Sequence, residues 1–109
     1  MKAKIGTHYD LTKVQALVRE AKFLTTMRVR SYLLNHGYDP NETVRDVVCA
    51  IQPRHFHKSS ELDKRPGVFA DIYRHVECYE TEWYVKIFLD DDENPHVSIW
   101  SLKEEGFQF

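Results

Sequence analysis

The sequence lacks the signatures of several large protein classes. No stretch approaches the roughly 20 apolar residues of a membrane-spanning helix, so we expect no contact with a membrane. Residues 1–6 contain no apolar run after their lysines, so a secretory signal is not expected and a cytoplasmic location is favoured. The chain also contains no P-loop, no G-x-G-x-x-G turn and no G-x-S-x-G elbow, which argues against the common nucleotide-binding and hydrolase sites.

Cysteine is scarce as well. Cys49 and Cys78 have no C-x-x-C partner, so a structural zinc site and, in a reducing cytoplasm, a disulfide are not expected. We interpret both as small buried hydrophobic side chains. His55 and His57, at a spacing that would place both on one face of a strand, could bind a metal together with His75 or Cys78. No carboxylate or cysteine is spaced to complete a tetrahedron, so we expect no metal and no other cofactor.

Charge is distributed unevenly along a chain of 109 residues, which is the size of a single domain spanning residues 1–109. Residues 1–38 hold seven Lys or Arg and two acids, whereas residues 77–109 hold two Lys or Arg and nine acids. The basic N-terminal part of the chain indicates either ordinary solvated surface or a basic face that binds an anionic partner.

The N-terminal half predicts three helices. The first follows Asp10 as N-cap and has apolar residues at helical spacing over 11–21. The second begins at Thr25 or Thr26 and ends before residue 37. The third begins with Asp39-Pro40-Asn41-Glu42, where Asp39 is the N-cap, Pro40 is the first helical residue and the Glu42 side chain reaches back to the cap. This helix ends before residue 53.

After residue 53 the hydrophobic period changes to two. Residues 83–90 alternate as a strand, residues 97–102 return beside them, and residues 91–95 form the hairpin loop. A further strand runs from residue 67 to about residue 76, after a turn at residues 64–67. Helices followed by an antiparallel sheet predict an α+β fold, with the N-terminal helices packed on a small antiparallel sheet.

Three strand-like stretches, residues 56–59, 68–75 and 83–87, carry Lys, Arg, His and Tyr within apolar runs. Alternation places Tyr84 and Lys86 on one face of their strand. If the strands are neighbours, these residues could converge with groups from the other stretches on one surface. Such groups can hold a phosphodiester and move a proton beside it, as a small ribonuclease requires.

Each of these residues also has a structural interpretation. The lysines could be solvated, and Tyr84 could be a cross-strand packing partner. Arg74 could pair with Asp71 or Glu77, and the histidines could hydrogen-bond to the backbone.

The stretches also resemble, in order and spacing, the motility quorum-sensing regulator (MqsR) toxins of bacterial type II toxin–antitoxin pairs. The resemblance starts at residues 8–11 and is clearest at residues 56–59, 71–74, 84–87 and 98–104. It implies a RelE-like α+β fold and a metal-independent endoribonuclease that cuts single-stranded mRNA in a short sequence context, GCU in the family. It also implies a cognate antitoxin that neutralises the toxin, with DNA contacted only indirectly through that antitoxin.

The resemblance implies roles for individual residues. The family lysine within F-Y-K-S falls on Lys58, the family tyrosine on Tyr84 and the arginine after D-V-Y on Arg74. We predict that Lys58 and Arg74 stabilise the phosphorane and that Tyr84 positions or protonates the substrate. His57, which replaces the tyrosine of F-Y-K-S, is the predicted general base. The predicted substrate-binding residues are Lys86, Lys103, onto which the C-terminal family lysine falls, and His75.

Besides His57, the chain departs from the family pattern in three further places. The family glutamine before D-V-Y falls on Ala70, which cannot hydrogen-bond to substrate. The acidic loop at residues 91–95 is longer than the family's compact turn, and the nine acids of residues 77–109 contrast with the basic character of such toxins. These departures leave an alternative function, a catalytically weak or inactive RelE-like binding module that engages an antitoxin or a regulatory partner.

Overall fold

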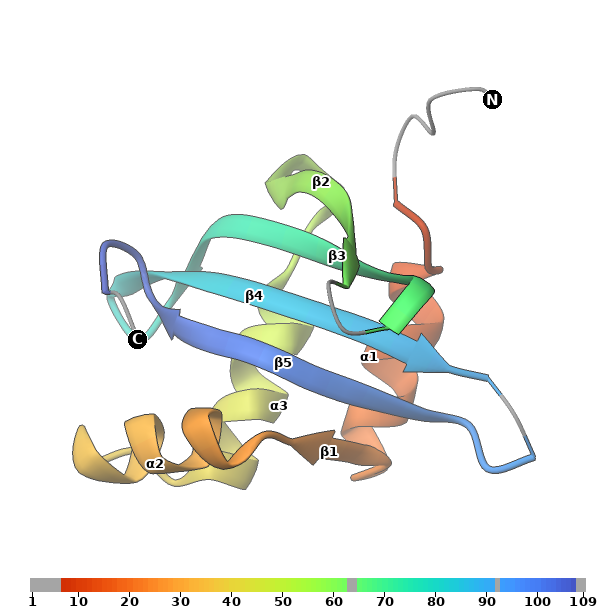
Figure 1. Cartoon of the computed structure of the whole chain (residues 1–109). Coiled ribbons are helices and arrows are strands. Elements are labelled where there is room, and N and C mark those ends of the chain that lie inside the picture. Colours follow the sequence, from red (N-terminus) through yellow and green to blue (C-terminus); the bar gives the residue numbers. More distant parts are fainter. Residues whose placement is uncertain (1–6, 63–64, 92, 108–109) are drawn as a thin grey trace.

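Three helices cover one face of a five-stranded sheet in the computed structural model, which describes residues 7–62, 65–91 and 93–107 (Figure 1). The helices are α1 (Leu11–Arg19), α2 (Met27–Asn35) and α3 (Pro40–Ala50), followed by a short 3-10 turn, η1 (Pro53–His55). The strands are β1 (Phe23–Thr25), β2 (Phe56–Leu62), β3 (Arg65–Cys78), β4 (Thr81–Asp90) and β5 (His96–Glu104).

The strand order across the sheet is β1-β5-β4-β3-β2. All neighbouring pairs are antiparallel except β1 and β5, which run parallel. The predicted α+β class, with helices on a small antiparallel sheet, is therefore confirmed, and the arrangement is consistent with a RelE-like fold. No helix in the described part of the chain is long and apolar enough to cross a membrane. Residues 1–6, on which the signal-sequence prediction rests, lie outside the described residues.

The predicted helix starts are confirmed by their caps. The side chains of Asp10, Thr26 and Asp39 accept hydrogen bonds from backbone N–H groups of the first turns of α1, α2 and α3. These bonds satisfy donors that have no partner within a helix. The first helix is shorter than predicted: α1 ends at Arg19, and Ala21 has a left-handed φ of 61°.

The strand predictions are confirmed for β4 and β5, which pair as neighbouring antiparallel strands, whereas β1 was not predicted. The loop predicted at residues 91–95 includes Asp92, which lies outside the described residues. The strand-like stretch at residues 56–59 is the first part of a longer strand, β2. The turn predicted at residues 64–67 is wrong for Arg65–Gly67, which begin β3, and Lys64 lies outside the described residues. Cys49 and Cys78 are free and only partly buried, so the prediction that both are buried is corrected.

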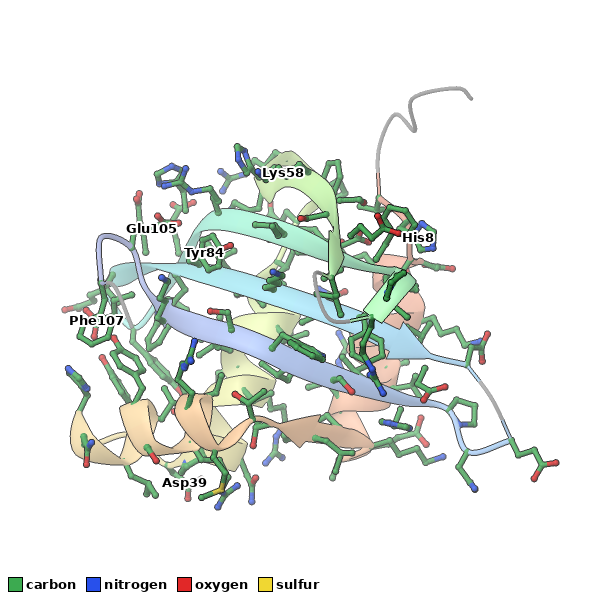
Figure 2. All side chains as sticks on the ribbon, viewed as in Figure 1. His8, Asp39, Lys58, Tyr84, Glu105 and Phe107 are labelled. Atoms are coloured by element: carbon green, nitrogen blue, oxygen red, sulfur yellow. The ribbon has the colours of Figure 1, made fainter. Side chains whose placement is uncertain are left out.

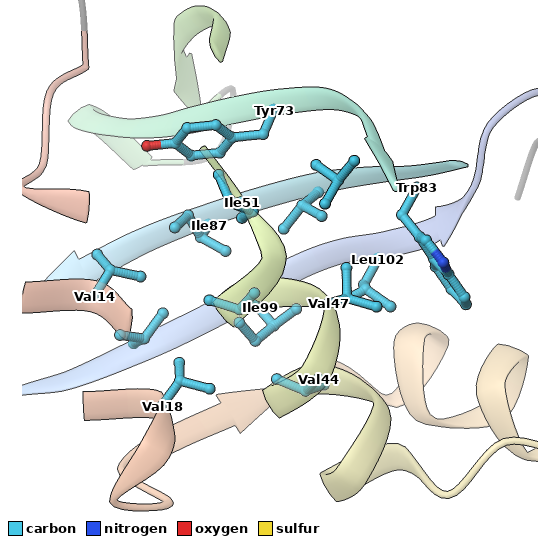
Figure 3. Close-up of a cluster of buried hydrophobic side chains, with 14 of the residues drawn as sticks. Val14, Val18, Val44, Val47, Ile51, Tyr73, Trp83, Ile87, Ile99 and Leu102 are labelled. Carbon is cyan, nitrogen blue, oxygen red and sulfur yellow. The ribbon is translucent and has the colours of Figure 1, made fainter. Parts of the chain in front are cut away.

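The main core lies between the helices and the sheet (Figure 3). Strand alternation places Trp83, Val85 and Ile87 of β4 on the helix side, where all three are fully buried. Val14 of α1 and Val47 of α3 are equally inaccessible and pack in the same cluster. Complete burial of one such aliphatic side chain contributes about 1.5–3 kcal/mol. This packing fixes which sheet face is covered and leaves the opposite face to carry polar groups.

A buried carboxylate joins the N-terminal segment to the sheet. Asp71 of β3 is fully buried and accepts hydrogen bonds from the backbone N–H groups of His8 and Tyr9, each at 2.9 Å. It also accepts one from the hydroxyl of Ser59 in β2. The Tyr9 hydroxyl donates to the carbonyl of Phe69 at 2.6 Å. Asp71 therefore ties both the residues before α1 and strand β2 to strand β3.

We predict that Asp71→Ala lowers the free energy of unfolding by about 3 kcal/mol, because three partly buried donors lose their fully buried acceptor at about 1 kcal/mol or more each. Urea denaturation measures the change. Asp91→Ala is the matched control, since Asp91 is about half exposed in its 2.8 Å ion pair with Lys13 and should cost about 1 kcal/mol or less. Equal destabilisation by the two substitutions would contradict this role for Asp71.

Candidate functional site

The face of the sheet opposite the helices gathers four cations and a phenol, and we call this set, Lys58, Arg74, Tyr84, Lys86 and Lys103, the cation face. The ladder pairs Lys58 of β2 with Ile72 of β3, and Ile72 with Lys86 of β4. Directly paired residues place their side chains on the same side of the sheet. Ile72 is only 3% exposed although it lies outside the helix-side core. The two lysines flank it, as expected if their aliphatic stems cover it.

Tyr84 lies at the centre of the next row along β4. Lys103 of β5 pairs with it in the ladder, and the Lys103 ammonium lies 5.0 Å from the centroid of the Tyr84 ring. On the other side, Arg74 and His75 of β3 together oppose Tyr84, because the register shifts between Tyr73 and Val76. Figure 2 shows Lys58, Tyr84 and Glu105 over the same half of the sheet. The neighbouring strands thus bring Lys58, Arg74, Tyr84, Lys86 and Lys103 onto one surface.

Three β-bulges direct these side chains. The register shifts in β2 between Phe56 and Lys58, in β3 between Tyr73 and Val76, and in β5 opposite Lys86 and Ile87, where Trp100 is the extra residue. Each bulge inserts one residue and changes which later side chains face the helices. Strict alternation from Val97 would send Lys103 toward the helices, so the bulge at Trp100 places Lys103 beside Tyr84.

Arg74 is held by an acid that the sequence analysis did not identify. Its guanidinium donates to Glu105 Oε1 at 2.9 Å, and Glu105 Oε2 accepts from the backbone N–H of His75 at 3.0 Å. The expected partners Asp71 and Glu77 are therefore wrong, since Asp71 binds backbone donors and Glu77 pairs with Arg54. The Glu105 side chain is 15% exposed. Its position directly after β5 was the only sequence signal for this contact.

The ion pair shifts the pKa of both partners. Burial alone would raise the pKa of Glu105, but the hydrogen bonds from Arg74 and from the His75 N–H lower it below its ordinary value. The hydrogen bond to Glu105 raises the pKa of Arg74. The Arg74 Nε atom is buried and has no hydrogen-bond partner within the described residues. A buried donor without a partner is unusual in a folded protein.

The Tyr84 phenol acts as a hydrogen-bond donor at neutral pH. Burial raises its pKa above the ordinary value of 10, while the charge of Arg74 lowers it and that of Glu105 raises it. The phenol therefore stays protonated and can donate to an oxygen anion, but it is poorly suited to remove a proton.

The two predicted site histidines lie apart from the centre of the cation face. His57 is the extra residue of the β2 bulge, is exposed, and has no hydrogen-bond or ion-pair partner in the described part of the chain. His75 has a left-handed φ of 58°, and its ring Nδ1 lies 2.9 Å from Glu82 Oε1. Within the described residues, no hydrogen bond joins either ring to the cation face.

The metal-site geometry that we considered is wrong. His55 lies in η1 rather than in a strand and is 6% exposed, with its Nδ1 accepting from the Gln52 N–H. His57 is exposed beyond it, so the two rings share no strand face. Across the described residues, no three His, Cys, Asp or Glu side chains lie close enough together to hold a metal ion.

Ala70, on which the family glutamine is expected to fall, is fully buried on the same side of the sheet as the cation face. It packs in a small cluster with Leu62 and Phe88, against which Trp100 also lies. Sequence reasoning missed this apolar part of the face because Phe88 and Trp100 read as ordinary strand residues.

Comparison with known proteins identifies one family. The sequence model described as "Motility quorum-sensing regulator, toxin of MqsA" matches residues 6–104. A search of curated proteins found no match to the chain. The family match covers nearly all of the chain, from the segment before α1 to the end of β5.

We predict that Arg74→Gln raises the pKa of Glu105, because burial continues to raise it while the guanidinium that lowers it is lost. An NMR titration of the Glu105 carboxyl carbon measures the change. Lys86→Gln, which removes a cation that does not contact Glu105, should leave that pKa nearly unchanged.

The sign of the stability effect follows from linkage. A Glu105 pKa below its unfolded value means that the ion pair stabilises the protein above about pH 4.5. The contribution is lost as the pH falls through the folded-state pKa. An unchanged Glu105 pKa in Arg74→Gln would show that the ion pair is absent in solution.

Proposed function

Because the chain belongs to the family of motility quorum-sensing regulator toxins, we propose that it is the toxin of a type II toxin–antitoxin pair. The proposed activity is metal-independent endoribonuclease cleavage of single-stranded mRNA in a short sequence context. The observation that carries this proposal is the cation face, where Lys86, Arg74 and Lys103 adjoin the protonated phenol of Tyr84 and Lys58 lies in the row of Lys86.

The proposed reaction is attack of a ribose 2′-hydroxyl on the adjacent phosphorus. The 2′-oxygen forms a bond to phosphorus, the bond to the 5′-oxygen breaks, and the products are a 2′,3′-cyclic phosphate and a 5′-hydroxyl. A base takes the proton of the 2′-hydroxyl, and an acid supplies one to the leaving 5′-oxygen. Negative charge on the phosphoryl oxygens increases in the transition state, so cations fixed beside them lower the barrier.

The side chains divide these tasks. Lys58 and Arg74 stabilise the phosphorane, and Lys86 and Lys103 hold the flanking phosphates. Tyr84, as a donor, positions the phosphoryl oxygen or protonates the leaving group. His57 is the proposed general base, since an imidazole can accept a proton at neutral pH and this one directly precedes Lys58. His75, paired with Glu82, would contribute to substrate binding from the end of the sheet.

A second candidate function is supported by two features of the same face. Glu105 occupies the guanidinium that would bind a phosphate, and Ala70 offers no hydrogen bond. These features favour a catalytically weak or inactive binding module that engages an antitoxin or a regulatory partner.

The proposed protein partner is an antitoxin of the MqsA type, since the family description pairs these toxins with MqsA. Binding of that antitoxin would neutralise the toxin, and DNA would be contacted only through the antitoxin. A cytoplasmic location follows from an mRNA substrate.

We predict that induced expression of the wild-type chain in a bacterium arrests growth and produces new mRNA 5′ ends, whereas Lys58→Ala does neither. Loss of one cation at the developing phosphorane should lower cleavage at least about 100-fold, as removal of one oxyanion donor does in other enzymes. Mapping of transcript ends measures the cleavage.

Lys22→Ala is the matched control, because Lys22 is more than half exposed and pairs with Glu20 away from the cation face. It should behave as the wild type. Equal growth and no new transcript ends with the wild type and with Lys58→Ala would refute the nuclease and favour the binding module.

A further inference from the structure

A hollow of about 190 Å³ lies on the sheet face that carries the cations. It is lined chiefly by Leu24 of β1, Arg65 of β3, Phe88 of β4 and Ser98 and Trp100 of β5, and we call it the Trp100 hollow. Its volume is below the about 300–1,000 Å³ of sites that enclose a drug-sized molecule. The hollow therefore suits one planar group resting against its wall.

Aromatic rings form the floor of this hollow. Phe88 is 7% exposed, and its ring centroid lies 5.8 Å from that of Trp100 with the planes tilted by 51°. The small side chain of Ala70 leaves room for Phe88 to pack down onto the sheet. The Trp100 indole remains partly exposed, and the Arg65 guanidinium carbon lies 5.9 Å from the Phe88 centroid.

The apolar character extends to the edge of the sheet. Leu24 pairs with Ser98 in the parallel ladder and is 63% exposed. An exposed leucine beside a partly exposed tryptophan loses contact with water when a ring covers both. Ser98 places a hydroxyl between them that can donate or accept a hydrogen bond.

The Trp100 hollow directly adjoins the cation face. Lys86 and Phe88 are two residues apart on the same side of β4, which places them about 6.6 Å apart along the strand. Ser101, which pairs with Lys86, follows Trp100 in the chain. Lys58 lies two residues before Ser60, which pairs with Ala70 beneath Phe88. A ligand that covers both the Trp100 hollow and the cation face needs a flat π surface and a negative charge. The two groups must be separated by about the spacing between neighbouring rows of the sheet.

We propose that the Trp100 hollow binds a nucleobase of single-stranded RNA, adjacent to the phosphodiester on the cation face. This inference rests on the proposed function and adds a subsite to it. A nucleotide has the required combination of a planar ring and an anion. Its base is accessible only when unpaired, which fits a single strand and excludes a duplex. Stacking tolerates any base, so the subsite supplies affinity more than sequence choice.

The experiment measures equilibrium binding of two strands of ten units. One is a 2′-O-methyl RNA of mixed sequence containing GCU, which retains its bases but has no free 2′-hydroxyl to react. The other is an abasic strand with the same phosphate spacing. Trp100→Ala should weaken binding of the base-bearing strand by roughly ten-fold or more and leave the abasic strand unchanged. Trp100→Phe should retain most of the affinity, because a ring remains.

Two further readouts separate stacking from a loss of folding or charge. Lys86→Ala should weaken binding of both strands by a similar factor, since it removes a phosphate contact. Tryptophan fluorescence of the wild type should be quenched by the base-bearing strand only, and Trp100→Phe should lose that quenching. Trp83 cannot account for it, because that side chain is fully buried on the other side of the sheet.

The outcomes also separate this subsite from the proposed function. If the wild type binds the base-bearing strand but does not cleave ordinary RNA, and Trp100→Ala weakens that binding, the nuclease is refuted and the subsite is supported. If the wild type cleaves RNA but Trp100→Ala binds the base-bearing strand as tightly as the wild type does, the subsite is refuted and the nuclease is supported. An equal loss for both strands would overturn the subsite, and so would a Trp100→Ala defect limited to binding of an MqsA-type antitoxin.

Discussion

The requirement that one sheet face bury apolar side chains while the other carries cations determines the rest of this structure. In an unbroken strand, residues on the same side are an even number of positions apart. Ile99 and Leu102 of β5 are three positions apart, and both are fully buried in the core. The extra residue at Trp100 resolves the conflict, because it allows Leu102 to face the helices and Lys103 to face the opposite side. Without it, either a leucine would be exposed or an ammonium would be buried without a partner.

The same constraint explains how much could be predicted from the sequence. The helix starts at Asp10 and Asp39 were predictable, because capping depends on a few consecutive residues. The alternation of β4 was equally readable, since that strand lies centrally and buries alternate residues from Trp83 to Leu89 in the core. The three-residue β1 was not, because it depends on pairing with β5, which is remote in sequence. The bulges were not either, because each depends on the register with the neighbouring strand and not on its own residues alone. The side on which Lys103 lies was therefore not determined by its own segment.

The acidic C-terminal segment and the cationic surface are compatible because the acids occupy defined positions. Glu77 pairs with Arg54, Glu82 with His75 and Glu105 with Arg74. These contacts lie at the end of the sheet where β3 turns into β4 and β5 ends. The net charge of a segment therefore says little about the charge of the face to which its strands contribute. Lys86 and Lys103 come from the most acidic part of the chain.

Glu105 also determines the order in which the cations become available to an anion. Lys58 and Lys86 make no ion pair within the described residues, so a phosphate can approach them without displacing a carboxylate. At Arg74, a phosphate must replace Glu105, whose own charge then loses its partner at a partly buried position. Replacement of Glu105 by a phosphate becomes favourable only when other contacts already hold the bound RNA in place. Stacking on the Trp100 hollow would supply such a contact without charge, and it would not weaken with salt as phosphate contacts do. The aromatic and cationic parts of the face are thus complementary. Stacking on the Trp100 hollow would retain the RNA while Arg74 exchanges Glu105 for a phosphate.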